Sequence, residues 1–314
     1  MTSMTSISSM MTARPASTFS RIVLLGHTGY IGSRLAAALN AAQAHVPLVG
    51  LSAPTLDLTR ADAPAALADV LDPGCALVIC SAIKKQLGDS LDVCERNLAI
   101  TLNVCRALAA RPVQRAVFLS SAAVYGEDVS HGVITEATSV QPTSWYGIAK
   151  FASERLLRRM AAERAASSLL ILRPAQVYGP GESDYYYGPS GFLRKALSHA
   201  PITLWGDGEE LREFLFIDDV VALVTRLMFS DTTGVLNVVS GTSYTYAQAL
   251  ELVATLTGES PAVTSRARTK AKVDHRFDAA ALLQACPGFT FTGIEEGLRR
   301  VAAEATAEAQ SARL

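Results

Sequence analysis

Short, largely apolar runs recur along the chain, at residues 21–25, 46–51, 76–80, 115–119 and 168–172. Such runs, rich in branched residues, are typical of strands that a parallel sheet buries on both faces. Between them lie longer stretches in which apolar residues return at helical spacing. This alternation predicts an α/β fold, namely a Rossmann-type, doubly wound parallel sheet with right-handed crossovers. Ligands of such sheets bind beyond the carboxyl ends of the strands.

The first apolar run leads into the glycine-rich segment Gly26-His27-Thr28-Gly29-Tyr30-Ile31-Gly32 and then into a helical stretch at 33–39. Gly26 permits a tight turn, Gly29 lets the backbone approach a pyrophosphate, and Gly32 lets helix and strand pack closely. The free amides at a helix N-terminus also bind phosphate oxygens. We therefore expect a dinucleotide site here. The alternative is an ordinary turn between a strand and a helix.

Tyr146 and Lys150 stand four residues apart at the start of the helical stretch 146–164, so their side chains share one helix face. A neighbouring ammonium stabilises the phenolate and lowers the tyrosine pKa from its usual value of about 10. Tyr146 is therefore a candidate general base, or a general acid in the reverse direction. Ser121 follows the run at 115–119 and would hold the same substrate oxygen. A Tyr-x-x-x-Lys pair alone is more often part of an ordinary exposed helix.

Three features together resemble the extended short-chain dehydrogenase/reductase family: the glycine turn, the segment Ser120-Ser121-Ala122-Ala123-Val124-Tyr125-Gly126, and the pair Tyr146 and Lys150. The nucleotide-sugar branch, the NAD-dependent epimerases and dehydratases, is the most similar. Residues 172–181 resemble the family's strand and turn beside the sugar. Residues 212–220 resemble the segment whose arginine holds the substrate diphosphate. The resemblance covers roughly residues 21–300.

The resemblance implies a role for each matching residue. Catalysis would fall to Ser121, Tyr146 and Lys150. The cofactor would be bound by Gly26, Thr28, Gly29, Tyr30, Ile31, Gly32, Ser52, Asp57, Leu58, Ser81, Ala82, Lys84, Asn97, Tyr146, Lys150 and Ala175. The substrate would be bound by Lys84, Ser121, Ala122, Tyr146, Gln176 and Arg212.

Some of these assignments have alternatives. Arg212 would bind the substrate diphosphate, because guanidinium forks match phosphate oxygens, but it could instead form an ion pair beside a helix. Gln176 stands where many relatives carry asparagine. Lys84 and Asn97 resemble positions near the nicotinamide, and they could equally be a solvated charge and a helix residue.

The cofactor implied is NAD or NADP. Relatives that prefer NAD usually end the second strand with an acidic residue that binds the ribose hydroxyls, and Ser52 occupies that position here. Serine does not repel a 2′-phosphate, and Arg34 could attract one from the first helix. Ser52 therefore favours NADP. Asp57 and Leu58 resemble the family's adenine-contacting pair, although Asp57 could instead be a turn residue.

The reaction implied is hydride transfer at a ring carbon of a nucleotide-activated sugar, commonly C4, with Tyr146 as the acid or base. An epimerase is our first interpretation. The second is a nucleotide-linked 4-keto-deoxysugar reductase that uses NADPH and serves polysaccharide or natural-product synthesis. The third is a non-catalytic, dinucleotide-binding regulatory protein, which would not need the intact Ser121, Tyr146 and Lys150. Dehydratases of the family carry Asp-Glu after the catalytic hydroxyl, and Ala122-Ala123 argues against dehydration.

Composition excludes other classes. The chain has 314 residues, a formal net charge of −1 and 18% charged residues, so no basic excess indicates a nucleic-acid partner. No apolar run approaches the roughly 20 residues of a membrane span. Its five cysteines contain no C-x-x-C, which is typical of reduced thiols in a cytosolic protein. We therefore expect a cytoplasmic protein. The family resemblance implies a nucleotide-sugar substrate and a homodimer; the apolar faces of residues 97–110 and 146–162 are compatible with such pairing, and core packing explains them equally well.

We expect two domains behind a disordered N-terminal extension, residues 1–20, which is rich in Ser, Thr and Met. Residues 21–175 and about 213–240 would form the NAD(P)-binding Rossmann domain. Residues of about 176–212 and 241–314 would form a smaller C-terminal α/β substrate domain. The run Tyr185-Tyr186-Tyr187 predicts a loop, either a lid over the substrate or a surface loop packed by its own rings.

Overall fold

The computed structural model describes residues 19–42, 45–85, 88–163, 168–182, 187–259 and 261–311. The predicted N-terminal extension, apart from its last two residues, lies outside the described residues. So do Tyr185 and Tyr186 of the predicted aromatic loop.

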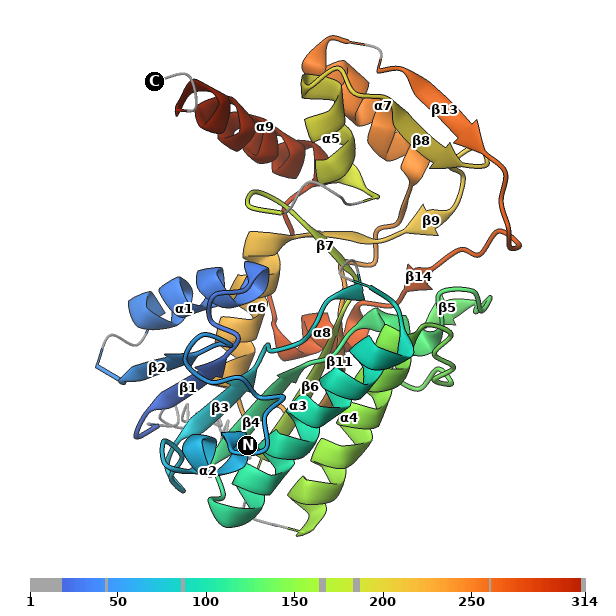
Figure 1. Ribbon diagram of the computed structural model, residues 1–314. Coiled ribbons are helices and arrows are strands. Elements are labelled where there is room, and N and C mark those ends of the chain that lie inside the picture. Colours follow the sequence, from blue (N-terminus) through green and yellow to red (C-terminus); the bar gives the residue numbers. More distant parts are fainter. Residues whose placement is uncertain are drawn as a thin grey trace, which may run out of the picture.

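A parallel sheet forms the centre of the lower half of the molecule in Figure 1. Its strands follow the order β11-β6-β4-β3-β1-β2, and each neighbouring pair is parallel. This order confirms the predicted doubly wound sheet. The strands are β1 (Ile22–Leu25), β2 (Leu48–Leu51), β3 (Ala76–Ile79), β4 (Arg115–Leu119), β6 (Ser168–Pro174) and β11 (Gly234–Val238). The sequence pattern did not predict β11, because Asn237 interrupts its apolar run.

Helices cover both faces of the sheet. Strand β1 is therefore buried on both sides, which explains why all of its residues are apolar. Ile22 and Leu24 pack on the side of α1 (Tyr30–Ala42) and α6 (Ile217–Met228), whereas Val23 and Leu25 face the opposite side. That side is covered by α2 (Ala63–Ala68), α3 (Leu91–Ala110) and α4 (Trp145–Glu163). Since successive strand residues point to opposite faces, a strand between two helical layers needs apolar side chains at every position.

Smaller elements lie beyond the carboxyl edge of the sheet, in the upper half of Figure 1. Two-stranded pairs link distant parts of the chain, so that β14 lies beside β5 and β13 beside β8. The division into a cofactor domain and a substrate domain remains a prediction. The remaining elements are η2 (Ala122–Tyr125), β5 (Val133–Ile134), β7 (Gln176–Tyr178), α5 (Pro189–Leu197), β8 (Ile202–Trp205), β9 (Leu211–Arg212), β10 (Phe214–Phe216), β12 (Tyr244–Thr245), α7 (Tyr246–Thr257), β13 (Val263–Arg266), β14 (Arg276–Phe277), α8 (Ala280–Ala285) and α9 (Ile294–Ser311).

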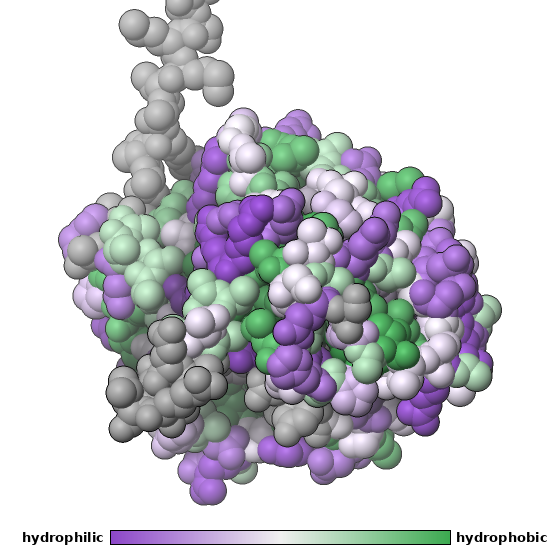
Figure 2. Space-filling view, turned by 90° about the horizontal axis from the view of Figure 1, so that it is seen from above, coloured by the Kyte–Doolittle hydropathy of each residue, from purple (hydrophilic) through white to green (hydrophobic). Residues whose placement is uncertain are grey.

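The face seen from above in Figure 2 mixes hydrophilic and apolar side chains without a single dominant patch. None of the described helices has the length and apolar character needed to span a membrane. Within the described ranges, no cluster of His, Cys, Asp and Glu is arranged to bind a metal ion. All of the cysteines are free thiols, as the absence of C-x-x-C led us to expect.

Candidate active site

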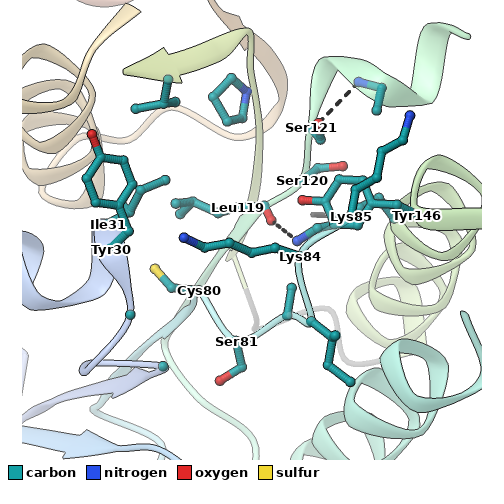
Figure 3. Close-up of a pocket in the computed structure, with 18 of the residues that line it drawn as sticks. Tyr30, Ile31, Cys80, Ser81, Lys84, Lys85, Leu119, Ser120, Ser121 and Tyr146 are labelled. Atoms are coloured by element: carbon teal, nitrogen blue, oxygen red, sulfur yellow. Dashed lines mark hydrogen bonds between the residues drawn. The ribbon is translucent and has the colours of Figure 1, made fainter. Parts of the chain in front are cut away.

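A cavity of about 880 Å³ opens at the carboxyl edge of the sheet. Its walls come from the segments that follow β1, β2, β3, β4 and β6, together with residues from β9, α7 and the start of β14. This volume lies within the roughly 300–1,000 Å³ of ligand sites. Figure 3 shows Tyr30 and Ile31 on one side of the cavity and Ser121 and Tyr146 on the other. Of the predicted site residues, all but Asn97 line it.

The glycine turn has the geometry that a dinucleotide site requires. Gly26 has a φ of +83°, which side chains other than glycine rarely adopt. A Cβ on Gly32 would lie 2.0 Å from the Gly26 carbonyl oxygen, so the first turn of α1 closes tightly onto the end of β1. The residues at the start of α1 line the cavity, and the amides of a helix N-terminus can bind phosphate. These residues therefore fit a dinucleotide pyrophosphate.

The predicted catalytic residues meet on the opposite wall. Ser121 follows β4, and its Oγ accepts a hydrogen bond from the Ala123 amide at 3.1 Å, which starts η2. Tyr146 and Lys150 lie in the first turns of α4, and the Lys150 Nζ is 5.7 Å from the centre of the Tyr146 ring. All three line the same cavity. The sequence prediction that they converge is therefore consistent with the structure.

The ammonium of Lys150 is buried, with 6% of the residue exposed. Its Nζ donates to the Leu119 carbonyl at 2.6 Å and lies 4.8 Å from the centre of the Phe118 ring. Burial lowers the Lys150 pKa to about 8, against the opposing influence of Cys80 and Glu154. Lys150 therefore keeps its positive charge near neutral pH, at the distance from Tyr146 where that charge stabilises a phenolate.

The start of α4 is held in place by side chains from two other segments. The Asp89 carboxylate accepts a hydrogen bond from the Tyr146 amide at 2.9 Å, and the Ser144 hydroxyl accepts one from the Gly147 amide at 3.1 Å. Free amides at a helix N-terminus need such acceptors. Asp89 precedes α3, so the two helices that flank the cavity are joined at Tyr146.

The part of the cavity beside β2 carries no free carboxylate at the end of that strand. The Ser52 amide donates to the Thr55 hydroxyl at 3.2 Å, and Asp57 accepts from the Thr59 amide and hydroxyl at 2.9 and 2.7 Å. Arg34 does not line the cavity, because its guanidinium binds the Asp218 carboxylate and the Pro180 carbonyl. Arg34 does line a smaller pocket beside Thr28, Gly29 and Lys84, so its attraction for a 2′-phosphate stays a prediction.

Asn97 supports the cavity from behind. Its side-chain oxygen accepts from the Ile83 amide at 2.8 Å, and its nitrogen donates to the Ile83 carbonyl at 3.0 Å. Asn97 thereby fixes the segment that carries Lys84, and it takes the helix-residue role that the sequence left open. Its neighbour Arg96 does line the cavity, although the resemblance did not indicate it.

The opposite end of the cavity is formed by Gln176 and Arg212 with two aromatic rings. The Gln176 amide nitrogen donates to the Tyr187 carbonyl at 2.8 Å, and its oxygen accepts from the Tyr246 hydroxyl at 3.3 Å. The Tyr187 and Tyr246 ring centres are 4.3 Å apart. Arg212 uses one nitrogen for the Leu211 and Val273 carbonyls. Gln176 therefore anchors the end of the aromatic loop, a contact that the sequence could not reveal.

Two titratable residues at this end were not predicted. Glu213 accepts hydrogen bonds from the amides of Ser240 and Gly241, and burial raises its pKa to about 7. Burial lowers the His275 pKa to about 4, so that imidazole is neutral at physiological pH. Both residues line the cavity. Glu213 lies within the family-like segment 212–220, and His275 lies outside the segments that carry the resemblance.

Residues 22–239 match the model of the NAD dependent epimerase/dehydratase family. The chain is 30% identical over 224 residues to the 2′-dehydrokanamycin reductase of Streptomyces kanamyceticus, which is 67% of this chain and 58% of that protein. The first curated relatives are thus matched over less than two thirds of their own length.

Solved structures resemble nearly the whole chain. One is MoeE5 in complex with UDP-glucose and NAD, with 27% identity, a TM-score of 0.79, and coverage of 92% of this chain and 99% of that one. Another is RMD from Pseudomonas aeruginosa complexed with NADPH, with 25% identity, a TM-score of 0.79 and the same coverage. The predicted fold, enzyme class and cofactor class (NAD or NADP) are confirmed. The chain belongs to the NAD dependent epimerase/dehydratase family.

Proposed function

We propose that this enzyme acts on a nucleotide-activated sugar, that the reacting centre is one ring carbon, C4, and that Tyr146 is the acid or base. The convergence of Ser121, Tyr146 and Lys150 on the cavity that begins at the glycine turn supports this proposal most directly. The family match and the UDP-glucose complex of MoeE5 support the substrate class. Epimerisation is the first form of the reaction that we propose.

Each catalytic residue has a separate task. Tyr146, as a phenolate, accepts the proton of the ring hydroxyl, and the Lys150 ammonium stabilises that phenolate. Ser121 already accepts from the Ala123 amide, so its own hydroxyl proton remains available for the same substrate oxygen. When bound, the nicotinamide ring supplies the hydride acceptor or donor. In the reverse direction, the Tyr146 phenol returns the proton.

We assign the substrate diphosphate to the end of the cavity that holds Arg212. One Arg212 nitrogen is held by two backbone carbonyls, which orients the guanidinium fork. A fixed fork pairs well with phosphate oxygens, because little side-chain freedom is lost on binding. The sugar would then lie between Arg212 and Tyr146, both of which line the cavity.

The second candidate is an NADPH-dependent 4-keto-sugar reductase. Ser52 favours it, since this neutral residue ends β2 where a carboxylate would select against a 2′-phosphate. The similarity to the 2′-dehydrokanamycin reductase also points to net reduction. A regulatory, non-catalytic role has less support, because the full set of catalytic groups is present.

The two reactions differ in what they consume. We would incubate the purified enzyme with a panel of nucleotide sugars and their 4-keto forms, each with NAD, NADH or NADPH. Interconversion of two epimers without net change in cofactor absorbance identifies the epimerase. Stoichiometric loss of NADPH absorbance with a keto sugar identifies the reductase. If neither reaction occurs with any sugar nucleotide, the proposed substrate class is wrong.

A further inference from the structure

A buried polar network lies next to the catalytic residues, between α4 and the carboxyl ends of β4, β6 and β11. We call it the Glu154 network. In a protein core, polar and charged side chains cost free energy unless each is paired. All five of its side chains are buried: Ser120, Tyr125, Glu154, Arg173 and Asn237.

The contacts of the network form one continuous chain. Arg173 makes a two-pronged ion pair with Glu154, at 2.9 Å to one carboxylate oxygen and 2.6 Å to the other. The Ser120 hydroxyl donates to the Glu154 carboxylate at 2.5 Å. On the other side, Arg173 donates to the Tyr125 hydroxyl at 2.8 Å, and that hydroxyl donates to Asn237 at 2.7 Å. The Glu154–Arg173 pair is therefore hydrogen-bonded by Ser120 on one side and Tyr125 on the other, whereas the Asn237 amide nitrogen has no partner among the described residues.

Each link of the network adjoins a residue of the proposed active site. Glu154 lies one helical turn after Lys150 on α4, and Ser120 directly precedes Ser121. Tyr125 ends η2, the short helix that the Ser121 hydroxyl begins. The network thus joins α4, which carries Tyr146 and Lys150, to the β4 end that carries Ser121.

A buried ion pair of this kind is weak evidence for stability, because the cost of desolvation is of the same size as the attraction. Geometry is the property that a two-pronged contact controls well. Catalysis between a phenol, a hydroxyl and a substrate oxygen depends on geometry, and a misplacement of about 1 Å can cost about a hundredfold in rate.

We propose that Glu154 and Arg173 are positioning residues, which set the distance between Ser121 on the β4 end and the Tyr146 and Lys150 pair on α4. This inference rests on the proposed function. Neither residue lines the cavity, so each acts through its neighbours and touches no substrate. Ser120 is the link through which the pair holds the β4 end.

Ser120→Ala tests the link without stranding a buried charge. Because Ser120 also lines the cavity, the pH profiles of the charge variants below separate positioning from a direct contact with substrate. We expect kcat to fall at least about tenfold, with the dissociation constant of the dinucleotide within about twofold of wild type. Ser168→Ala is the matched control, because the Ser168 hydroxyl accepts a hydrogen bond from buried Arg115 at 2.9 Å at the opposite edge of the same sheet. Its kcat should stay within about twofold of wild type.

Two single charge variants and their double variant provide a second test, the pH dependence of kcat. A purely structural role of the ion pair would not change this pH dependence. Glu154→Gln leaves the Arg173 charge unmatched near Lys150, so the Lys150 ammonium loses its proton at lower pH and the alkaline limb of the kcat profile moves down. Arg173→Met leaves the Glu154 charge unmatched, and the limb moves up. The double variant carries neither charge, and its limb should return towards that of wild type. Several charged and titratable groups surround Lys150 and the nearby Glu154–Arg173 pair. They are Cys80 after β3, Asp89 before α3, Tyr125 on η2, Tyr146 and Glu154 on α4, and Arg173 on β6.

Two outcomes would overturn the inference. One is a folded Ser120→Ala variant with wild-type kcat. The other is a set of single charge variants whose alkaline limbs coincide with that of wild type or move in the same direction. Tyr146→Phe, measured alongside, separates this failure from failure of the proposed function. If Tyr146→Phe is inactive and Ser120→Ala is fully active, only the positioning role is wrong.

Discussion

Lys150 and Arg212 are two cations that differ in burial and in their position in the cavity. We expect this difference to give them different functions. Lys150 is enclosed by the Leu119 carbonyl and the Phe118 ring, so its charge acts at short range on Tyr146. Arg212 is only partly buried and lines the far end of the cavity. Its planar guanidinium group can therefore contact a ligand bound at that end of the cavity. A charge beside the reacting carbon changes kcat, whereas a charge at the far end mainly changes binding.

Arg212→Ala should therefore raise the Michaelis constant about tenfold or more, with a smaller effect on kcat, because it removes a charge-assisted contact with the substrate diphosphate. Steady-state kinetics with the preferred nucleotide sugar measures this. Arg268→Ala is the control: Arg268 pairs with Asp207 and does not line the cavity. An unchanged Michaelis constant in Arg212→Ala would remove Arg212 from the diphosphate site.

Glu213→Gln should change how stability depends on pH. Burial raises the Glu213 pKa from 4.5 to about 7, so between these values the folded state holds a proton that the unfolded state has lost. The contribution of Glu213 to the free energy of unfolding therefore falls as pH rises from about 4.5 to about 7. Urea unfolding at pH 5 and pH 8 measures that fall, which should be smaller in the variant. Glu182 contributes in the same direction and His275 in the opposite one, so the difference between the variant and wild type is the quantity that reports on Glu213. An equal fall in both proteins would contradict this expectation.

Several residue roles could not be read from the sequence. Arg34 follows the glycine turn, but its contacts with Asp218 and Pro180 come from segments 184 and 146 residues away. Glu154 and Arg173 look like an ordinary helix glutamate and a strand arginine until the fold brings them together. Local spacing predicts which residues share a helix face or a strand end. It does not predict which distant partner a long side chain finds.

At the scale of elements, the glycine turn is the part that the sequence predicted most completely. Its glycines are explained by a positive φ at Gly26 and by the contact of Gly32 with the Gly26 carbonyl. These constraints involve residues close together in the chain, so the spacing of the glycines is enough to predict them. β11 shows the opposite case, because Asn237 faces the buried Tyr125 hydroxyl and breaks the apolar pattern for a tertiary reason.

Gly32→Ala should weaken dinucleotide binding about tenfold or more. The added methyl group would lie 2.0 Å from the Gly26 carbonyl oxygen, so the start of α1 must move away from the end of β1. Isothermal titration calorimetry with NAD and NADP measures the affinity. Gly132→Ala is the control, since nothing lies within 4 Å of a Cβ at that position. A folded Gly32→Ala protein with wild-type affinity would show that the turn does not hold the pyrophosphate.

At the scale of the whole molecule, the alternation of strands and helices predicted the fold, and the structure and its relatives confirm it. What the sequence did not supply is the arrangement beyond the sheet, where short strands such as β5 and β14 pair across more than a hundred residues. Such strands carry too few residues for a period to be seen. The predicted homodimer remains a proposal.

The outer surfaces of α3 and α4 support that proposal, because Leu91, Leu102, Trp145 and Ile148 are exposed there. Exposed apolar side chains gathered on adjacent helices favour a protein–protein contact. Leu102→Glu should convert the dimer to a monomer, as measured by light scattering after size exclusion. Leu283→Glu, an exposed leucine on α8, should leave the dimer intact. A wild-type protein that is monomeric at micromolar concentration would contradict the proposal.

The central claim is that Tyr146 exchanges a proton with the substrate beside a bound dinucleotide. The most direct test compares kcat and dinucleotide affinity in wild type, Tyr146→Phe and Tyr244→Phe, the last being a tyrosine outside the cavity. Loss of general acid–base catalysis costs roughly 10²–10⁴-fold in rate. We expect Tyr146→Phe to lose turnover by at least about a hundredfold while its dinucleotide affinity stays within a few-fold, and Tyr244→Phe to remain active. Near-normal turnover in Tyr146→Phe would contradict the account.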